Sequence, residues 1–251
     1  FRKMTKAERR EQRRQRRVEK MLMSGRAADD LEVPADYVPE WTPGPLEARS
    51  EDQGHYILAI KSSELIFGIG PAGTGKTYVC AAMAAQELMA GRIKKLVITR
   101  PAVTAKGENM GFLPGDVQEK FAPYLGPFRD VLDERLGRSH VDNLLRNGKI
   151  EAAPLAYIRG RTFNNAWLIL DEAQNTTPET MKMFLTRIGH NCKTIVNGDL
   201  RQSDIPGTNG LKDALDRLGQ LRRVSVVELE TVIRSGLVQD IVEAYEGKAA
   251  A

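Results

Sequence analysis

The sequence predicts an α/β domain in which a mostly parallel sheet lies between two layers of helices. Short apolar runs of strand length alternate with amphipathic helical patterns, which is typical of parallel sheets with right-handed crossovers. A glycine-rich phosphate-binding motif stands between the first of these runs and the helix after it. The length of 251 residues suits one such domain with a well-buried core. With 41% hydrophobic and 28% charged residues, the composition excludes disordered, collagenous and membrane-spanning classes.

The N-terminal part of the chain is distinguished by its charge. Residues 1–20 contain ten Lys or Arg and three Glu, so a basic arm is predicted over residues 1–30, either flexible or helical. Such an arm is either a solvated tail or an electrostatic contact for phosphate backbones. Residues 31–52 predict a proline-rich linker, and residues 53–251 predict the folded domain. The linker contains the prolines Pro34, Pro39, Pro43 and Pro45.

Five apolar, β-branched-rich runs predict strands that are buried on both faces of a sheet. In chain order they are Glu64–Gly70, Lys94–Arg100, Ala166–Glu172, Lys193–Asp199 and Val224–Glu230. Apolar residues at three- and four-residue spacing predict helices in four further segments. These are Lys76–Met89, Thr177–Ile188, Asn209–Leu218 and Leu237–Tyr245.

An amphipathic pattern between the second and third predicted strands is interrupted by Pro123 and Pro127. Because proline breaks helices, two helical pieces with a break between them are expected there. The apolar stripe of this pattern is expected to pack in the core. It consists of Phe121, Leu125, Phe128 and Leu132.

The two cysteines, Cys80 and Cys192, stand singly in apolar surroundings, so both are expected to be small buried hydrophobic residues. Two cysteines are too few for a disulfide framework or a metal cluster. The chain has no apolar run long enough to span a membrane and no secretory signal at its start. We therefore expect a reducing, cytoplasmic location.

The phosphate-binding motif runs from Gly70 to Thr77 and reads GPAGTGKT. Its glycines allow a tight turn whose N–H groups point at a phosphate, and the following helix adds the positive end of its dipole. Lys76 is expected to reach the β- and γ-phosphate oxygens, and the Thr77 hydroxyl to bind Mg²⁺. The residues expected to contact the nucleotide are Gly70, Pro71, Ala72, Gly73, Thr74, Gly75, Lys76, Thr77 and Tyr78.

Two later strands are predicted to end in polar groups at the same edge of the sheet, since the carboxyl ends of parallel strands meet there. Asp171, after an apolar strand, is expected to hold Mg²⁺ through water, and Glu172 to accept a proton from the attacking water. After the next strand, Asn197 or Asp199 could position that water. Gln202 could bond the γ-phosphate and report its loss.

Two single residues complete the predicted site. Arg234, between the last predicted strand and the last helix, is either a surface arginine or an arginine finger that stabilises charge on the transferred phosphoryl group. Gln53, just before the first strand, could bond the adenine edge, because its amide both donates and accepts.

Several blocks together resemble the PhoH family: FGIGPAGTGKTYVCAAMAAQELMAGRIKKLVITRPAV, GENMGFLPGD, PLAYIRGRTF, AWLILDEAQNTTPETMKMFLTRIG and VNGDLRQSD. The resemblance covers roughly residues 50 to 246. It implies a RecA-like, three-layer P-loop NTPase fold, similar to the first motor domain of superfamily 1 helicases, and the use of ATP. It also implies nucleic-acid contacts at Arg100, Arg159 and Arg161. The chain departs from the family pattern after Arg234, where Ser235 and Gly236 replace His and Pro.

The sequence as a whole predicts a Mg²⁺-dependent ATPase that is coupled to RNA or single-stranded nucleic acid. The expected catalytic residues are Lys76, Asp171, Glu172, Gln202 and Arg234. No second motor lobe fits in the chain, so Arg234 would act across a subunit interface, in a homo-oligomer such as a hexameric ring. Two alternatives stay open: a P-loop phosphotransferase with a second substrate, and a nucleotide-binding scaffold with incidental hydrolysis.

Overall fold

The structure is a computed structural model that describes residues 44–101, 125–202 and 207–233. Its centre is a parallel sheet of six strands in the order β3-β2-β4-β5-β1-β6, which confirms the predicted α/β class. The strands are β1 (Leu65–Ile69), β2 (Lys95–Arg100), β3 (Ile150–Pro154), β4 (Ala166–Leu170), β5 (Lys193–Gly198) and β6 (Val224–Glu228). Five of them lie where the sequence predicts strands.

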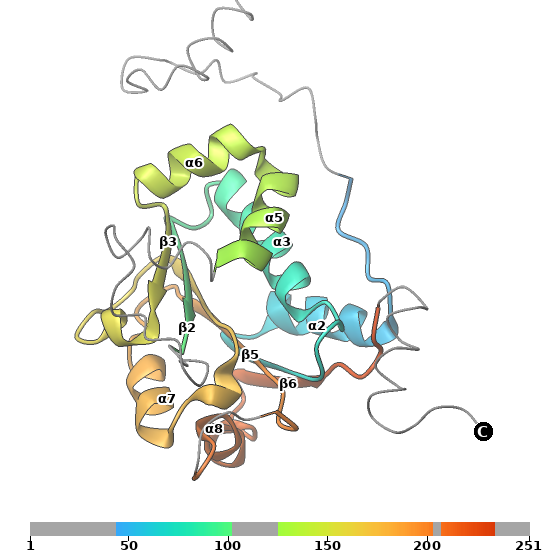
Figure 1. Cartoon of the computed structure of the whole chain (residues 1–251), viewed down its shortest axis with the longest axis vertical. Coiled ribbons are helices and arrows are strands. Elements are labelled where there is room, and N and C mark those ends of the chain that lie inside the picture. Colours follow the sequence, from blue (N-terminus) through green and yellow to red (C-terminus); the bar gives the residue numbers. More distant parts are fainter. Residues whose placement is uncertain (1–43, 102–124, 203–206, 234–251) are drawn as a thin grey trace, which may run out of the picture.

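Helices cover both faces of the sheet. On one face the core joins the sheet to α2 (Glu51–Ser62), α3 (Lys76–Met89), α5 (Gly126–Leu136) and α6 (Arg138–Arg146). On the other face it joins α7 (Pro178–Leu185), α8 (Gly210–Leu218) and the short 3₁₀ turn η4 (Leu155–Ile158). Figure 1 shows α3, α5 and α6 on the opposite side of the strands from α7 and α8. The three-layer arrangement follows the prediction.

One strand and one α-helix were not predicted from the sequence. The edge strand β3 pairs with β2, and helix α2 precedes β1. The start of α2 is stabilised because the Ser50 hydroxyl accepts a hydrogen bond from the Gln53 N–H, and Glu51 and Asp52 lie in the first turn. This helix begins at Glu51, two residues inside the stretch 31–52 that was predicted as linker.

Of the two prolines expected to interrupt the helical pattern, Pro123 lies outside the described residues and Pro127 does not break a helix. Pro127 is in the first turn of α5, where a missing N–H costs nothing, so it starts this helix instead of interrupting it. The described break is at Gly137, whose φ of 79° ends α5 before α6 begins. Phe128 and Leu132 are fully buried, as the apolar stripe predicts, whereas Phe121 lies outside the described residues.

A buried hydrogen-bond network lies directly beneath the phosphate-binding loop. The Tyr56 hydroxyl of α2 donates to Asn197 Oδ1 of β5 at 2.6 Å, and the Asn197 amide donates to Cys80 Sγ of α3 at 3.4 Å. All three side chains are fully buried. Two of them lie beside Gly68 of β1, where any Cβ would stand 2.8 Å from both Asn197 Oδ1 and the Tyr56 ring. Burial raises the pKa of the Cys80 thiol, and Asp171 adds to the effect. Cys192 is also buried and free, as expected.

Other predicted features fall outside the described part of the chain: the basic arm, most of the linker, Arg234 and the helix Leu237–Tyr245. Among the residues that are described, no helix has the length and apolar character needed to cross a membrane.

Candidate functional site

The phosphate-binding loop connects the end of β1 to the start of α3. Gly75 precedes α3 with a φ of 85°, a conformation that glycine adopts readily, and no side chain caps the N–H groups of the first turn. These N–H groups therefore remain available for an anion. The Lys76 ammonium donates to the Gly70 carbonyl oxygen at 2.6 Å and to that of Pro71 at 2.8 Å. Burial lowers the pKa of Lys76, and the nearby Asp171 carboxylate opposes this shift.

Gln53 braces this loop and lies away from the cavity. Its Nε2 donates to the Thr74 carbonyl oxygen at 2.9 Å, and its Oε1 accepts from the Arg49 N–H at 3.0 Å. The side chain is only 4% exposed and does not line the pocket. The expected contact between Gln53 and adenine is therefore not supported by this geometry, because the amide holds the loop backbone instead.

The segment after β6 lies against the same loop. Within residues 229–233, the Ile233 N–H donates to the Gly73 carbonyl oxygen at 2.9 Å. Asp52 of α2 accepts hydrogen bonds from two backbone N–H groups of this segment at 2.9 and 3.0 Å, and these bonds lower the pKa of its carboxyl. Helix α2 thus holds both the phosphate-binding loop, through Gln53, and the segment beside it, through Asp52.

Asp171 lies directly after β4, at the carboxyl edge of the sheet, as predicted. It is 3% exposed and forms an ion pair with Arg100, whose Nη2 and Nε lie 2.5 and 3.1 Å from Asp171 Oδ2. Burial raises the pKa of the Asp171 carboxyl, and the Arg100 guanidinium opposes this rise. Arg100 was expected to contact nucleic acid, but here its side chain is 16% exposed and lines the pocket.

Glu172 and the end of β5 complete the polar wall. Glu172 is exposed at the pocket with a φ of 55°, a left-handed backbone conformation that is uncommon for a residue with a side chain. Gln174 donates to Glu172 Oε2 at 2.7 Å and accepts from the Asp199 N–H at 3.0 Å. Asp199 and Gln202 both line the pocket, as predicted, whereas Asn197 is fully buried in the network below and cannot position water there.

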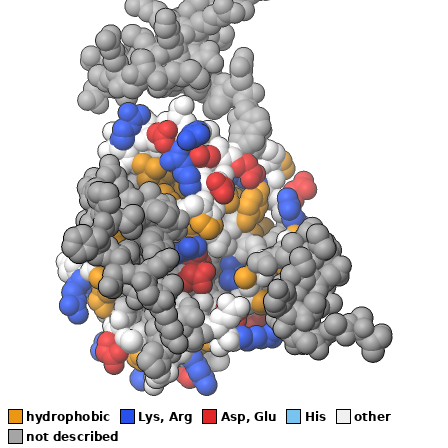
Figure 2. Space-filling model, viewed as in Figure 1, with side chains coloured by type: hydrophobic (Ala, Val, Ile, Leu, Met, Phe, Trp, Pro, Cys, Tyr) orange, Lys and Arg blue, Asp and Glu red, His pale blue; other side chains and the backbone are white. Residues whose placement is uncertain are grey.

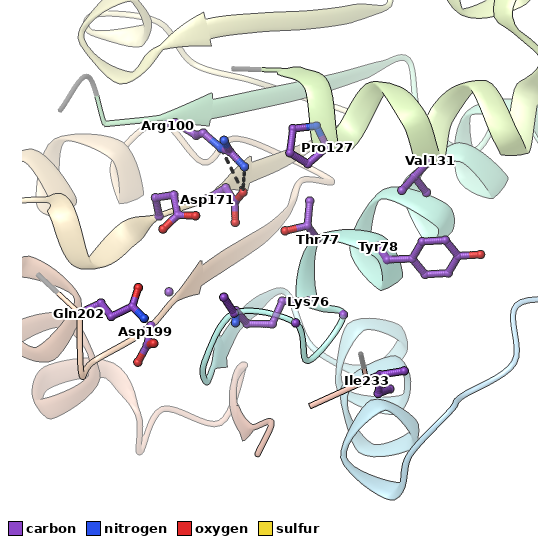
Figure 3. Close-up of a pocket in the computed structure, with 15 residues that line it drawn as sticks. Lys76, Thr77, Tyr78, Arg100, Pro127, Val131, Asp171, Asp199, Gln202 and Ile233 are labelled. Carbon is purple, nitrogen blue, oxygen red and sulfur yellow. Dashed lines mark hydrogen bonds and ion pairs between the residues drawn. The ribbon is translucent and has the colours of Figure 1, made fainter. Parts of the chain in front are cut away.

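These groups surround one cavity of about 520 Å³. Figure 3 shows Arg100, Asp171, Asp199 and Gln202 on one side, with Lys76 and Thr77 between them and an apolar side. The apolar side is formed by Tyr78, Pro127, Val131 and Ile233. In the space-filling view, acidic and basic side chains gather next to one another at the centre of the face (Figure 2). The cavity therefore combines a charged half with an apolar half.

The other two expected nucleic-acid contacts lie away from this cavity. Arg161 forms an ion pair with Glu151 of β3 through both of its terminal nitrogens, and Lys95 lies 2.7 Å from the same carboxylate. These two cations lower the pKa of Glu151 to about 2, with the Arg161 hydrogen bond as the largest cause. Arg159 is exposed. Neither Arg159 nor Arg161 lines the pocket, so of the three arginines Arg100 alone is part of it.

Three residues that line the pocket, and Gln174 behind it, were not predicted from the sequence. Pro127 and Val131 are spaced four apart on α5, next to the buried stripe that was recognised, so helical periodicity could have indicated their shared face. Gln174 connects the ends of β4 and β5, and its position within the acidic motif was the available signal. Ile233 follows the last strand with no pattern of its own.

The fold and the cavity define a P-loop nucleotide-binding α/β domain. The family model described as "PhoH-like protein" matches residues 45–246, and the chain belongs to this family, as the motifs indicated. It is 50% identical over 205 residues to a PhoH-like protein of Bacillus subtilis strain 168. It is 51% identical over 207 residues to Protein PhoH of Escherichia coli K12.

Each alignment covers 80% of this chain, but only 64% of the Bacillus protein and 58% of the Escherichia protein. Among solved structures, the Pif1 helicase from Candida albicans overlays with a TM-score of 0.42 at 14% identity. That overlay covers 80% of this chain and 44% of the helicase chain.

Proposed function

We propose that this domain binds ATP together with Mg²⁺ and hydrolyses it with a water molecule as the nucleophile. The observation that carries this proposal is the convergence of the phosphate-binding loop, the buried Asp171 and the exposed Glu172 on one cavity. A volume of about 520 Å³ falls within the usual range of ligand pockets. The apolar side near Tyr78 and Val131 suits a base, and the side near Lys76 suits phosphates.

The donor atoms present fit a magnesium ion. In Figure 3 the Thr77 hydroxyl faces the Asp171 carboxylate across the cavity, and oxygen ligands are what Mg²⁺ prefers. No group of three or more His, Cys, Asp or Glu in residues 44–101, 125–202 and 207–233 could hold a metal alone. This agrees with Mg²⁺ sites that use one or two protein ligands plus substrate phosphates and water. When bound, the ion would neutralise charge on the phosphates.

The residues of the chain have separate roles in this proposal. Lys76 and the N–H groups at the start of α3 bind and orient the phosphates. Glu172 holds the attacking water and accepts its proton, and Gln174 keeps the Glu172 carboxylate in place through the 2.7 Å hydrogen bond. Gln202, which follows the neighbouring strand β5 and lines the same cavity, would bond the terminal phosphate. Hydrolysis instead of transfer is favoured because a carboxylate stands directly beside the acid that holds the metal.

Replacing Glu172 with Gln tests the hydrolytic step. The exposed amide keeps the shape of the side chain but cannot accept the proton, so we expect the rate of ATP hydrolysis to fall by about 10²- to 10⁴-fold. Binding of a fluorescent ATP analogue should be retained, because the phosphate-binding loop is unchanged. A variant that hydrolyses ATP at the original rate would refute the role of Glu172. Absence of nucleotide binding to the unaltered chain would refute the proposed function.

Coupling to RNA or single-stranded nucleic acid is the second part of the proposal, and it is supported by the charge of residues 1–20. Addition of single-stranded RNA should raise the ATPase rate, and removal of residues 1–20 should weaken this effect and its dependence on salt. An ATPase rate that RNA and DNA leave unchanged would favour the scaffold or the phosphotransferase.

We also propose that Arg234 acts on a neighbouring subunit. Equilibrium sedimentation tests this proposal, because a monomer with full ATPase activity would contradict it.

A further inference from the structure

The ion pair between Arg100 and Asp171 follows from the register of two neighbouring strands. Thr99 of β2 stands opposite Leu170 of β4, so the next residues along each strand, Arg100 and Asp171, stand side by side. Both lie on the face covered by α3 and α5, and the guanidinium lies 5.8 Å from the centre of the Phe128 ring of α5. Figure 3 shows this pair at the upper edge of the cavity.

Arg100 provides the counter-charge for a carboxylate that water barely reaches. Both guanidinium contacts, at 2.5 and 3.1 Å, are made to Asp171 Oδ2, and Asp171 is 3% exposed. A buried carboxylate without a partner is strongly unfavourable. Among the described residues that line the cavity, the other cation is Lys76, and it donates to the loop carbonyl oxygens of Gly70 and Pro71. Arg100 is therefore the cation that pairs directly with Asp171, and Lys76 acts on it only at longer range.

We propose that Arg100 is a positioning residue that pairs with Asp171 whenever no metal is bound and is displaced when Mg²⁺ enters with the nucleotide. This inference rests on the proposed function, because it assumes that Asp171 serves the metal. Two cations at one buried carboxylate repel each other, so the ion pair and the metal compete. Mg²⁺ must break the ion pair in order to bind. By linkage, the free energy of the ion pair is therefore subtracted from the binding free energy of Mg²⁺. The site thereby stays charge-balanced with and without its ligand.

The test measures metal binding without relying on turnover. A fluorescent ADP analogue at fixed concentration is titrated with Mg²⁺, and the melting temperature is measured in EDTA, for the unaltered chain, Arg100→Ala and Arg100→Lys. We expect Arg100→Ala to melt at a lower temperature in EDTA, because Asp171 loses its partner. Its half-saturating Mg²⁺ concentration should fall about tenfold, in keeping with the net strength of a charge-assisted hydrogen bond. Arg100→Lys, which loses the two-pronged contact, should lie between the two.

Arg129→Ala is the matched control. Arg129 also forms ion pairs, with Asp133 at 2.7 Å and Asp142 at 2.6 Å, but it does not line the cavity. This variant should leave the half-saturating Mg²⁺ concentration unchanged. If Arg100→Ala and Arg100→Lys bind Mg²⁺ as the unaltered chain does, or more weakly, the displacement of Arg100 is refuted while the proposed function stands. If the unaltered chain shows no Mg²⁺-dependent nucleotide binding, the proposed function itself fails, and this inference with it.

Discussion

Replacing Gln53 with Ala tests whether this residue braces the phosphate-binding loop or recognises adenine. The substitution removes two hydrogen bonds from a side chain that is 4% exposed, one to the Thr74 carbonyl oxygen and one from the Arg49 N–H. At about 1 kcal/mol for each bond, the free energy of unfolding should fall by about 2 kcal/mol. For a domain of this size that corresponds to a melting temperature lower by about 4–8 °C.

The nucleotide affinities decide between the two roles of Gln53. If the loop binds phosphates as proposed, a loosened loop should weaken the binding of ATP and GTP by the same factor, as measured by titration with fluorescent analogues of both nucleotides. Gln86→Ala is the control, since Gln86 is exposed on α3 and its removal should change stability by less than about 0.5 kcal/mol. Our reasoning is refuted if Gln53→Ala weakens ATP alone, or if its stability matches that of Gln86→Ala.

Three further predictions concern the loop and the sheet. Tyr56→Phe leaves the buried Asn197 Oδ1 without its donor and should lower the free energy of unfolding by about 1–3 kcal/mol in a urea titration; an unchanged midpoint contradicts this. Gly70→Ala places a Cβ onto the Leu229 carbonyl oxygen, so nucleotide binding and melting temperature should both fall, and normal binding would disprove the close approach. Glu151 has a folded-state pKa of about 2 against an ordinary value of 4.5, so its contribution is present above pH 4.5 and lost toward pH 2. The free energy of unfolding of Glu151→Gln should therefore be lower than that of the unaltered chain at pH 7, and the difference should narrow as the pH falls from 4.5 toward 2. A difference that does not change with pH would contradict the stabilising role of the Glu151 carboxylate.

The alternation of apolar runs was sufficient to predict five of the six strands, because strands buried on both faces carry a strong local signal. Four of the five were predicted to end one or two residues too late. The strand Ile150–Pro154 was missed because small residues, one charge and a proline give an edge strand little apolar character. In α2, the uninterrupted run from Tyr56 to Ile60 hides the helical period. The N-cap Ser50 followed by two acidic residues was the usable signal for this helix.

The site residues were predictable where they belong to one continuous motif. They were less predictable where the fold brings together two segments that are distant in the sequence. Lys76 and Thr77 line the cavity because loop and helix are contiguous in the sequence. The pairing of Arg100 with Asp171 depends on which strands are neighbours and in which register, and no local pattern contains that information. The same limit explains Gln53, whose partner in the loop is 21 residues away along the chain.

The strand order has a consequence for how the chain folds during synthesis. β1, which leads into the phosphate-binding loop, is among the first strands made, yet both of its neighbours, β5 and β6, are made last. The hydrogen bond from Tyr56 likewise cannot form until Asn197 is synthesised, 141 residues further along the chain. Such long-range pairing slows folding and leaves an apolar strand unpaired on the ribosome. A translating chain therefore holds every residue of its phosphate-binding loop long before it can present that loop to a nucleotide.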